Sequence, residues 1–433
     1  MNYPNNIVIV GSGAAGLFCA LQFPEQTNIT IITKSTVEKS DSFLAQGGIC
    51  VLPSEEDYDA YFEDTMKAGH YENRKESVEI MIRSSNQIIQ ELIGYGVDFE
   101  SEQGELCYTR EGGHSRPRIL FHEDVTGKEI TSKLLARVQE QKNITIYEHT
   151  TMLDILCQDN TCYGVVVEKA DGDITTLLAD HTILACGGLG GLYKHSTNFR
   201  HITGDALAIA LKHDIKLEHI NYVQIHPTTL YSSKPGRRFL ISESVRGEGA
   251  VLLNKNKERF VNELLPRDLL TEKVYEQMKA DDTPYVWLSM APIPEDAIKS
   301  HFPNIYQRCL EEGYDCTKEC IPVVPAQHYF MGGIWVDRHS ATSMDDLYAI
   351  GETSCNGVHG RNRLASNSLL ESLVFAKRCA SAILENASTN PRAPLSPEAA
   401  DLAKDEYQDI EKLMTRYHEA VRSEIERMNK ANE

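Results

Sequence analysis

The stretch TREGGHSRPRI, residues 109–119, surrounds one carboxylate with basic side chains. Glu111 follows Arg110, and Arg116 and Arg118 come after a Gly-Gly pair. A glycine-hinged loop of this charge suits an anionic ligand, because guanidinium groups bind carboxylates and phosphates bidentately. The glutamate then has two interpretations: it pairs with the arginines at the surface, or it binds a cationic group of the ligand. The loop alone leaves both open.

A second stretch, NIVIVGSGAAG, has the residues of a dinucleotide-binding turn. Residues 7–10 are predicted to form a short buried strand, and a helix is expected from the turn to about Phe23. In a GxGxxG turn the glycines allow a tight turn, close approach of a pyrophosphate and close packing of helix on strand. The helix N-terminus adds amide donors for the phosphate charge. We therefore expect cofactor contacts from Gly11, Ser12, Gly13, Ala14, Ala15 and Gly16.

The second β-rich run, residues 29–33, is followed by Lys34, where NAD-binding folds usually carry an acidic residue for the adenosine ribose. This departure weakens an NAD interpretation and leaves FAD open. Three further turns could return to the same long cofactor: SFLAQGGI at 42–49, and the glycine turns that carry Asp205 and Glu352. Each turn alone is more simply a capped turn, but together they favour one extended ligand.

The composition excludes several classes of function. The 433 residues predict two or three domains, and 41% hydrophobic and 24% charged residues are typical of a soluble globular protein. The net charge of −20 argues against nucleic acid or an anionic membrane surface as a partner. The apolar N-terminal stretch lacks the basic region of a signal peptide, and no stretch reaches the roughly 18 apolar residues of a membrane span. We expect a cytoplasmic protein.

The eleven cysteines occur mostly singly in apolar stretches, and the sequence has no CxxC pair. Reduced thiols in the cytosol are therefore expected. The closest group, Cys309, Cys316 and Cys320, has a spacing that fits no zinc or iron–sulfur ligand pattern well. No metal site is predicted.

The remaining pattern predicts an α/β protein with an insertion. Helices are expected at 76–92 and 127–141, and β-type runs at 143–149, 162–168 and 181–188.

The α/β pattern loosens between about 220 and 330 and returns at 345–354 and in a helix at 364–384. A Pro/Ser-rich linker then precedes a charged amphipathic helix over 400–432. This order favours a second domain inserted into the first.

Eight motifs occur in order over about residues 5–385: GSGAAG, AQGGI, TREGGHS, QIHPT, SESVRGEGA, ERFVNELLPRD, PAQHYFMGGI and GVHGRNRLASNSLLES. Together they resemble the flavoproteins that include L-aspartate oxidase and the succinate dehydrogenase and fumarate reductase subunits. The resemblance implies a Rossmann-type FAD-binding domain interrupted by an α+β capping domain, with the active site between them. It places the FAD-binding domain at 1–219 and 331–390, the capping domain at 220–330 and a short C-terminal helical segment at 391–433.

Two features are similar to the L-aspartate oxidase members. Respiratory members commonly carry a histidine, covalently linked to FAD, five residues before Gln46, where this chain has Asp41. The resemblance therefore implies non-covalent FAD. TREGGHS with Glu111, and LASNSLLE, also match these members, which convert L-aspartate to iminoaspartate for quinolinate synthase in de novo NAD biosynthesis, with oxygen or fumarate as electron acceptor. The alternative is a soluble fumarate reductase or succinate dehydrogenase flavoprotein.

The resemblance also assigns the binding of a C4 dicarboxylate. Arg363 is one clamp, and His226 and His328 bind the carboxylates with help from Ser242 and Glu243. Without the resemblance, His226 is more simply a buried turn histidine.

Arg267 matches the acid/base arginine of the family, with Glu243 as a relay, and Glu111 would bind the substrate ammonium. A surface salt bridge between Arg267 and Asp268 is the simpler interpretation from the residues alone. No role follows for Arg361. Beyond the GxGxxG turn, the resemblance implies cofactor contacts from Lys34, Asp41, Ser42, Gln46, Gly47, Gly48, Asp205, Glu352, Ser368 and Leu369.

Two other classes fit less well. An FAD-dependent tRNA-modifying protein would share the GxGxxG turn, but the acidic chain lacks a basic patch. A non-catalytic flavin scaffold would not explain why Arg267, His226, His328 and Arg363 all match active-site motifs.

Overall fold

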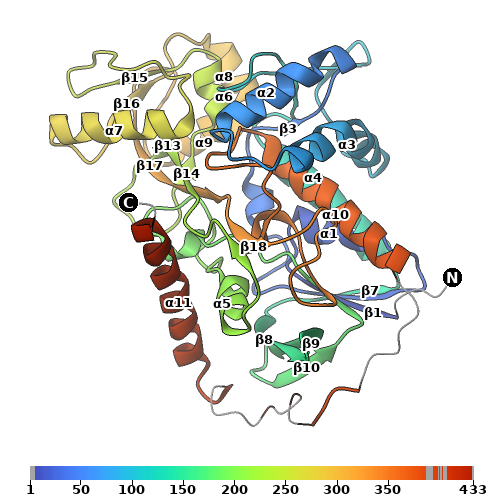
Figure 1. Cartoon of the computed structure of the whole chain (residues 1–433). Helices are drawn as coiled ribbons and strands as arrows, with labels where there is room; N and C mark the ends of the chain where they lie inside the picture. The colour runs from blue at the N-terminus through green and yellow to red at the C-terminus, as the bar shows by residue number, and fades with distance from the viewer. Residues whose placement is uncertain (1–4, 387–393, 398, 400–401, 403–406, 432–433) are drawn as a thin grey trace.

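The computed structural model describes residues 5–386, 394–397, 399, 402 and 407–431. A five-stranded parallel sheet, in the order β19-β11-β1-β2-β7, lies at the centre of its larger part (Figure 1). The strands are β1 (Asn6–Val10), β2 (Asn28–Ile32), β7 (Ile144–Tyr147), β11 (His181–Leu184) and β19 (Leu347–Ala349).

The central sheet is covered on both faces, which explains the nearly continuous apolar runs of its strands. Successive side chains of a strand point to opposite faces, so Ile7 and Ile9 pack with one layer and Val8 and Val10 with the other. The first layer consists of α1 (Ala14–Ala20), α2 (Tyr58–Ala68), α3 (Lys75–Gly94), α4 (Thr126–Glu140) and α10 (Asn367–Asn386).

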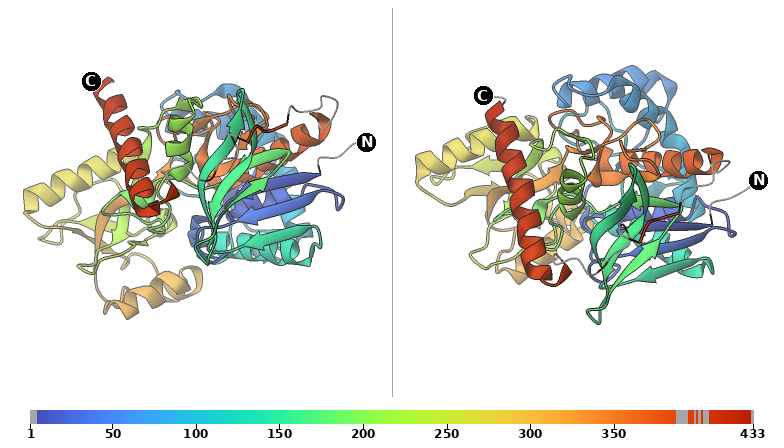
Figure 2. Two further views of the ribbon diagram at one scale, coloured as in Figure 1. Left: turned by 90° about the horizontal axis from the view of Figure 1, so that it is seen from below. Right: turned by 60° about the horizontal axis from the view of Figure 1, so that its bottom comes forward.

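The second layer is a three-stranded antiparallel sheet with two helices beside it (Figures 1 and 2). It contains β8 (Thr151–Gln158), β9 (Thr161–Glu168), β10 (Ile174–Leu178), α5 (Asp205–Lys212) and α11 (Ile410–Ala431).

A second five-stranded sheet, in the order β14-β13-β17-β16-β15, is antiparallel and has its own hydrophobic core, which includes Leu230, Ile241, Leu252 and Val323. Its strands are β13 (Val223–Leu230), β14 (Phe239–Leu240), β15 (Val251–Leu253), β16 (Val286–Ser289) and β17 (Ile321–Phe330). Its helices are α6 (Glu243–Gly247), α7 (Arg267–Asp281), α8 (Glu295–His301) and α9 (Pro303–Glu311).

Short elements complete the chain. They are the strands β3 (Ile49–Cys50), β4 (Ser101–Glu102), β5 (Glu105–Leu106), β6 (Ile119–Leu120), β12 (Leu217–Glu218), β18 (Gly333–Trp335) and β20 (Ser354–Cys355), and the 3-10 turns η1 (Asp41–Leu44), η2 (Glu55–Asp57), η3 (Gly190–Leu192) and η4 (Gly351–Thr353).

Several predicted elements are shorter than expected, and two of them differ most from the predicted bounds. The β-type run at 181–188 ends as a strand at Leu184, because the chain turns there into the wall of the pocket described below. The C-terminal helix begins at Ile410 rather than near 400; residues 387–393, 398, 400–401 and 403–406 of the predicted linker and helix lie outside the described residues. Leu413, Tyr417 and Val421 are buried at helical spacing, so α11 packs one face against the protein.

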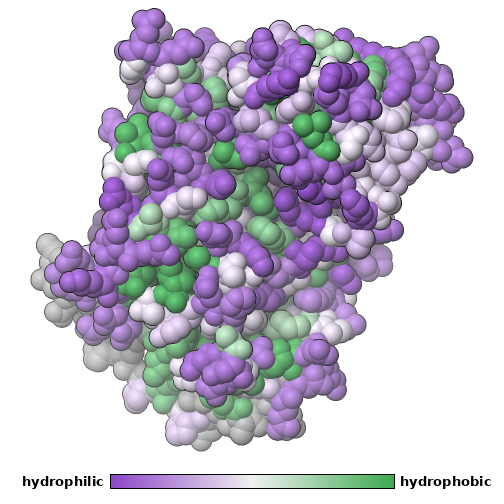
Figure 3. Space-filling view, turned by 180° about the vertical axis from the view of Figure 1, so that it is seen from behind, coloured by the Kyte–Doolittle hydropathy of each residue, from purple (hydrophilic) through white to green (hydrophobic). Residues whose placement is uncertain are grey.

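The face opposite to the view of Figure 1 is mostly hydrophilic, and hydrophobic residues gather in its middle and lower parts (Figure 3). Within the described part of the chain, no helix is long and apolar enough to cross a membrane.

Candidate active site

A pocket with an empty volume of about 1690 Å³, open solvent included, is lined by residues of both five-stranded units. The β1–α1 turn contributes Gly11 and Gly13, and the second sheet and its helices contribute His226, Arg267 and His328. Most predicted site residues line this pocket, although they come from segments far apart in the sequence. Ala14 and Gly16 of the predicted set do not line it.

The β1–α1 turn is packed so tightly that its glycines are required. Gly11 has a φ of +123°, and a Cβ atom there would lie 2.0 Å from the Ala185 carbonyl oxygen. A Cβ at Gly16 would lie 2.2 Å from the Gly11 carbonyl oxygen, so Gly16 packs the helix on the turn instead of facing the ligand. Ala14 is buried, and its amide donates to Ser42 Oγ at 3.0 Å. Ala14 and Gly16 are thus the two residues of the turn that do not line the pocket, and their contact with the cofactor stays a prediction.

Lys34 and Asp205 form an ion pair with each other. Lys34 Nζ lies 2.5 Å from Asp205 Oδ2 and also donates to Thr203 Oγ1 at 3.1 Å. Both charged residues line the pocket. The lysine that replaces the usual acidic residue thus joins the end of β2 to the start of α5.

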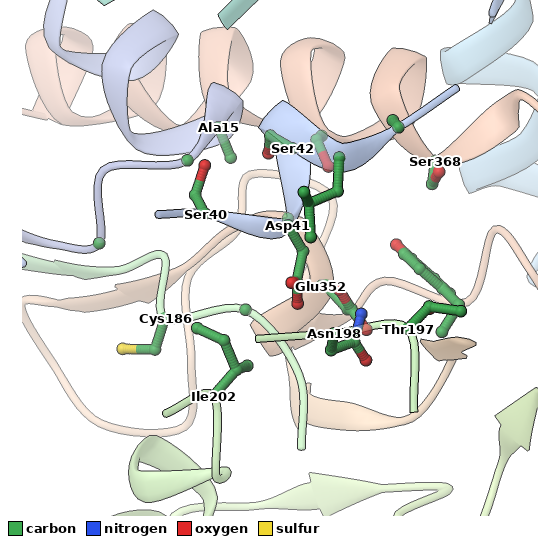
Figure 4. Close-up of a pocket in the computed structure, with 18 of the residues that line it drawn as sticks. Ala15, Ser40, Asp41, Ser42, Cys186, Thr197, Asn198, Ile202, Glu352 and Ser368 are labelled. Carbon is green, nitrogen blue, oxygen red and sulfur yellow. The ribbon is translucent and has the colours of Figure 1, made fainter. Parts of the chain in front are cut away.

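Two partly buried carboxyl groups, Asp41 and Glu352, lie in the middle of the pocket (Figure 4). Burial raises the pKa of Asp41 to about 7 and that of Glu352 to about 8. Asp41 Oδ1 accepts the Phe199 amide at 2.9 Å, but Asp41 Oδ2 and Gln46 Oε1 are buried without a hydrogen-bond partner. These polar atoms, with the glycine turn at one end, fit a flavin dinucleotide, which offers ring heteroatoms and a pyrophosphate.

Arg267 is held inside the pocket by one side chain from α6 and one from β13. Its Nε donates to Glu243 Oε2 at 2.7 Å and its Nη1 to Gln224 Oε1 at 2.8 Å. Arg267 and Glu243 are 7% and 3% exposed. Asp268 instead binds His70 at 2.7 Å, so a surface bridge between Arg267 and Asp268 is the wrong interpretation.

Arg363 is a second buried cation of the pocket. Its Nη1 donates to Ser368 Oγ at 2.5 Å, and its guanidinium stacks 4.2 Å from the Tyr329 ring centroid. Its Nε is buried without a partner. Burial, together with the charge of Arg267, lowers the pKa of Arg363 to about 10, so it stays charged at neutral pH.

His226 and His328 face each other with ring centroids 5.2 Å apart. Burial and the nearby arginines hold the pKa of both histidines well below the usual value. His226 Nδ1 lies 3.2 Å from the Thr228 amide nitrogen and 3.1 Å from the Thr228 carbonyl oxygen. His226 Nε2 is buried without a hydrogen-bond partner and is available to bond a ligand.

Glu111 is buried in the pocket with an exposed fraction of 3%. Its Oε1 accepts Ser244 Oγ at 2.8 Å and its Oε2 accepts Ser366 Oγ at 2.6 Å. Burial and the nearby Glu243 carboxylate raise the pKa of Glu111 above its usual value.

The arginines near Glu111 in the sequence have other partners in the fold. Arg118 is fully buried and binds Asp57 and Asp64, at 2.8 and 2.7 Å, and Arg116 Nε lies 3.7 Å from Asp57. Within the described residues, no cation forms an ion pair with Glu111 within 4.0 Å. The interpretation of Glu111 as a surface partner of these arginines is wrong.

The remaining predicted residues are more peripheral. Ser242 lines the pocket and caps α6, where its side chain accepts the Ser244 amide. Arg361 is exposed, and its Nη1 lies 4.0 Å from Glu72. Within the described residues, no cluster of three or more histidines, cysteines, aspartates or glutamates could hold a metal, so Cys309, Cys316 and Cys320 do not form one.

Sequence reasoning missed the side chains that hold the predicted ones. Most of them stand inside recognised motifs, but a hydroxyl or amide has many ordinary structural roles, so nothing singled them out. They are Thr197, Gln224, Ser244, Tyr329 and Ser366. The Thr197 hydroxyl, for example, lies 2.8 Å from His328 Nδ1.

Gly112→Ala tests how tightly the Glu243 side chain is packed beside Arg267. A Cβ at Gly112 would lie 2.1 Å from Glu243 Oε1, so Glu243 must move away from Arg267. We expect kcat/KM for the oxidised substrate to fall roughly 10- to 100-fold, because small displacements of catalytic groups have effects of this size. Gly94→Ala is the matched control, since its Cβ would meet no atom within 4 Å. Equal activity of both variants would show that Glu243 need not hold this position.

Comparisons with known proteins agree with this site. A family model described as an FAD binding domain matches residues 6–369. The chain is 50% identical to the L-aspartate oxidase of Clostridium perfringens over 374 residues, which cover 86% of this chain and 85% of the relative. It is 48% identical to the L-aspartate oxidase of Clostridium acetobutylicum over 382 residues, 88% of each.

Among solved structures, an E. coli quinol fumarate reductase superposes with a TM-score of 0.85 at 29% identity, over 95% of this chain and 74% of that one. These matches confirm the family resemblance and the α/β fold class predicted from the motifs. The chain belongs to the FAD-binding flavoprotein family that contains the L-aspartate oxidases and fumarate reductases, and FAD is its cofactor.

Proposed function

We propose that this chain oxidises L-aspartate to iminoaspartate in de novo NAD biosynthesis. The observation that carries the proposal is Glu111, a buried carboxylate bound by two serine hydroxyls in a pocket with two buried arginines. A plain dicarboxylate would be repelled by this group, whereas an α-amino acid brings an ammonium that pairs with it. Two relatives that match most of the chain are L-aspartate oxidases.

The carboxylates of the substrate are bound by the cationic and neutral donors of the pocket. Arg363 offers its unpartnered Nε, and His226 offers its unpartnered Nε2, which donates when the ring carries its proton there. The pKa of His226 is so low that it acts as a neutral hydrogen-bond donor. Together these groups hold the substrate in one orientation, which lowers the entropy cost of reaction.

Glu111 has two tasks in this scheme. It pairs with the substrate ammonium, and its raised pKa suits it to accept one proton from that ammonium. The resulting amine lone pair then favours loss of hydride from Cα. Bound FAD would supply the acceptor for this hydride and its two electrons.

Arg267, the first residue of α7, faces the carbon skeleton of the bound substrate in this scheme. Arg267 Nε donates to Glu243 Oε2 at 2.7 Å, so the buried Glu243 carboxylate can exchange protons with Arg267. Arginine rarely gives up its proton, so the relay must begin from its charged form. In the reverse direction the pair would deliver a proton to a carbon of fumarate.

Fumarate reduction is the second candidate activity. The two arginines and two histidines suit any C4 dicarboxylate, and a quinol fumarate reductase has the same fold. Under the main proposal, fumarate or oxygen takes the electrons from the reduced cofactor, and the product passes to quinolinate synthase. We also propose that residues 220–330 act as a capping domain, because they supply Arg267, His226 and His328 to the pocket.

The product assay tests the proposed function. With L-aspartate in air, the holoenzyme should form oxaloacetate and ammonium, by hydrolysis of iminoaspartate, and hydrogen peroxide, in equal amounts. Oxaloacetate without ammonium, or no product from L-aspartate while succinate is oxidised, would contradict it.

The FAD is expected to be non-covalent, because Asp41 stands where respiratory relatives carry the linking histidine. Acid precipitation of the purified holoenzyme should release all of the yellow colour into the supernatant. Flavin fluorescence that stays with the denatured chain on a gel would contradict this expectation.

A further inference from the structure

His114, three residues after Glu111, is buried behind the pocket and is not one of the residues that line it. Its two ring nitrogens bind different parts of the chain. Arg118 Nη1 lies 2.9 Å from Nδ1, and the Ala365 carbonyl oxygen lies 3.0 Å from Nε2. A guanidinium only donates and a carbonyl only accepts, so His114 is neutral and carries its proton on Nε2. Burial favours the same state, because it lowers the pKa of His114 to about 4.

Arg118 fixes one side of this connection. Its side chain is fully buried and forms ion pairs with Asp57 at 2.8 Å and Asp64 at 2.7 Å. Asp64 Oδ2 also accepts the amide and the hydroxyl of Ser115, at 2.8 and 2.7 Å. A buried cation that two carboxylates bind is costly to displace. The end of the loop that contains Glu111 is therefore tied firmly to the start and middle of α2.

The other side of the connection is a turn that ends at the start of α10. Ser366 has a φ of 61° there, a left-handed conformation that residues other than glycine adopt only when their surroundings impose it. The preceding carbonyl accepts from His114, and the carbonyl of Ser366 itself accepts from the Cys50 amide at 3.1 Å. Held in this way, the Ser366 hydroxyl donates to Glu111 Oε2 at 2.6 Å.

We propose that His114 is a positioning residue that sets the preference of the site for an amino acid over a plain dicarboxylate. The histidine connects the two segments that meet at Glu111: the loop that carries this glutamate and the turn that carries Ser366. It thereby aims Glu111 at the substrate ammonium without touching the substrate. The inference rests on the proposed function, which assigns that ammonium to Glu111.

Arg363 belongs to the same turn but has supports of its own. Its Nη1 donates to Ser368 Oγ at 2.5 Å, and its carbonyl accepts the Gln224 side-chain amide at 2.9 Å. A change at His114 should therefore disturb Glu111 more than it disturbs the dicarboxylate clamp. The two substrates separate these effects, because fumarate has the two carboxylates of L-aspartate but no ammonium.

The experiment measures, in the holoenzyme, the ratio of kcat/KM for L-aspartate oxidation to kcat/KM for fumarate reduction with a reduced viologen dye. His114→Leu removes both hydrogen bonds of the ring, while Arg118 keeps its two aspartates. We expect the ratio to fall roughly 10-fold, because small displacements of a binding group have effects of this size. His114→Gln places an amide donor near the position of Nε2 and should recover most of the ratio.

Two further variants locate the effect at Glu111. Ser366→Ala removes only the hydroxyl that binds Glu111 and should lower the ratio in the same direction. In the Glu111→Gln background the ion pair is already lost, so His114→Leu should change the ratio no further. The matched control is His301→Leu, which should leave the ratio unchanged. His301 is half-exposed at the end of α8 and pairs with Glu248 at 2.9 Å.

The outcomes distinguish this inference from the proposed function. If Glu111→Gln leaves the ratio unchanged, the proposed function fails and the inference fails with it. If Glu111→Gln lowers the ratio but His114→Leu and Ser366→Ala do not, the inference alone is overturned. It is also overturned if His114→Leu lowers the ratio equally in the Glu111→Gln background. If His114→Leu does not fold, the ratio of Ser366→Ala decides.

Discussion

Arg267→Leu is expected to abolish both aspartate oxidation and fumarate reduction while FAD stays bound. Arg267 is buried beside Glu243 and Gln224, at 2.7 and 2.8 Å, and faces the same pocket as Arg363. Its loss removes a fixed positive charge and leaves the Glu243 carboxylate without its closest cation. Losses of roughly 100- to 10000-fold in kcat are typical for groups of this kind. Steady-state rates with each substrate, and flavin content from visible absorbance, measure the outcome.

Asp268→Asn provides the matched control for this variant. Asp268 is the next residue along α7 but binds His70 at 2.7 Å, so its charge is not part of the pocket's chemistry. Its activity should be near normal. Arg267→Lys should not rescue activity, because lysine lacks the planar fork that reaches two acceptors. Near-normal fumarate reduction by Arg267→Leu would show that Arg267 has only a structural role.

Glu111→Gln should separate the two substrates. The neutral amide keeps the shape of the side chain but cannot form an ion pair with the substrate ammonium. Oxidation of L-aspartate should fall by on the order of 2–4 kcal/mol, roughly 30- to 1000-fold in kcat/KM. Fumarate reduction should survive or improve, because fumarate carries no ammonium and the repulsive carboxylate is gone.

A glutamate far from this chemistry controls for general effects of the substitution. Glu140 is exposed at the end of α4 and pairs with Arg137 at 3.0 Å, so Glu140→Gln should leave both activities unchanged. The melting temperature of Glu111→Gln should not fall, since a buried carboxylate without a cation costs free energy of folding. Equal losses with both substrates, or no loss with either, would mean that Glu111 does not recognise the amino group.

The dinucleotide-binding turn was predictable because residues that are adjacent in the sequence determine its conformation. Three glycines between an apolar strand and a helix are typical of this turn, and a Cβ atom added at Gly11 or Gly16 would lie only 2.0 or 2.2 Å from a backbone oxygen. What the pattern could not show is which residues of the turn line the pocket. Ala14 and Gly16 lie in the motif yet pack behind the pocket wall.

The burial of Glu111 could not be predicted from its neighbours, which are mostly charged. Its partners Ser244 and Ser366 are 133 and 255 residues away in the sequence. Arg267 is a similar case: its adjacent residue Asp268 suggested a salt bridge, but the fold brings in Glu243, 24 residues earlier. Pairings of this kind are set by the topology of the two sheets, and only the family resemblance supplied that information before the structure.

The central claim is that the pocket oxidises L-aspartate because Glu111 recognises its ammonium. Its most direct test mixes the holoenzyme with L-aspartate, or with succinate, without oxygen, and follows the visible absorbance of the flavin. L-aspartate should bleach the flavin completely, and succinate at least about 30-fold more slowly at equal concentration, in line with the value of one ion pair. Rapid bleaching by succinate with none by L-aspartate would contradict the claim.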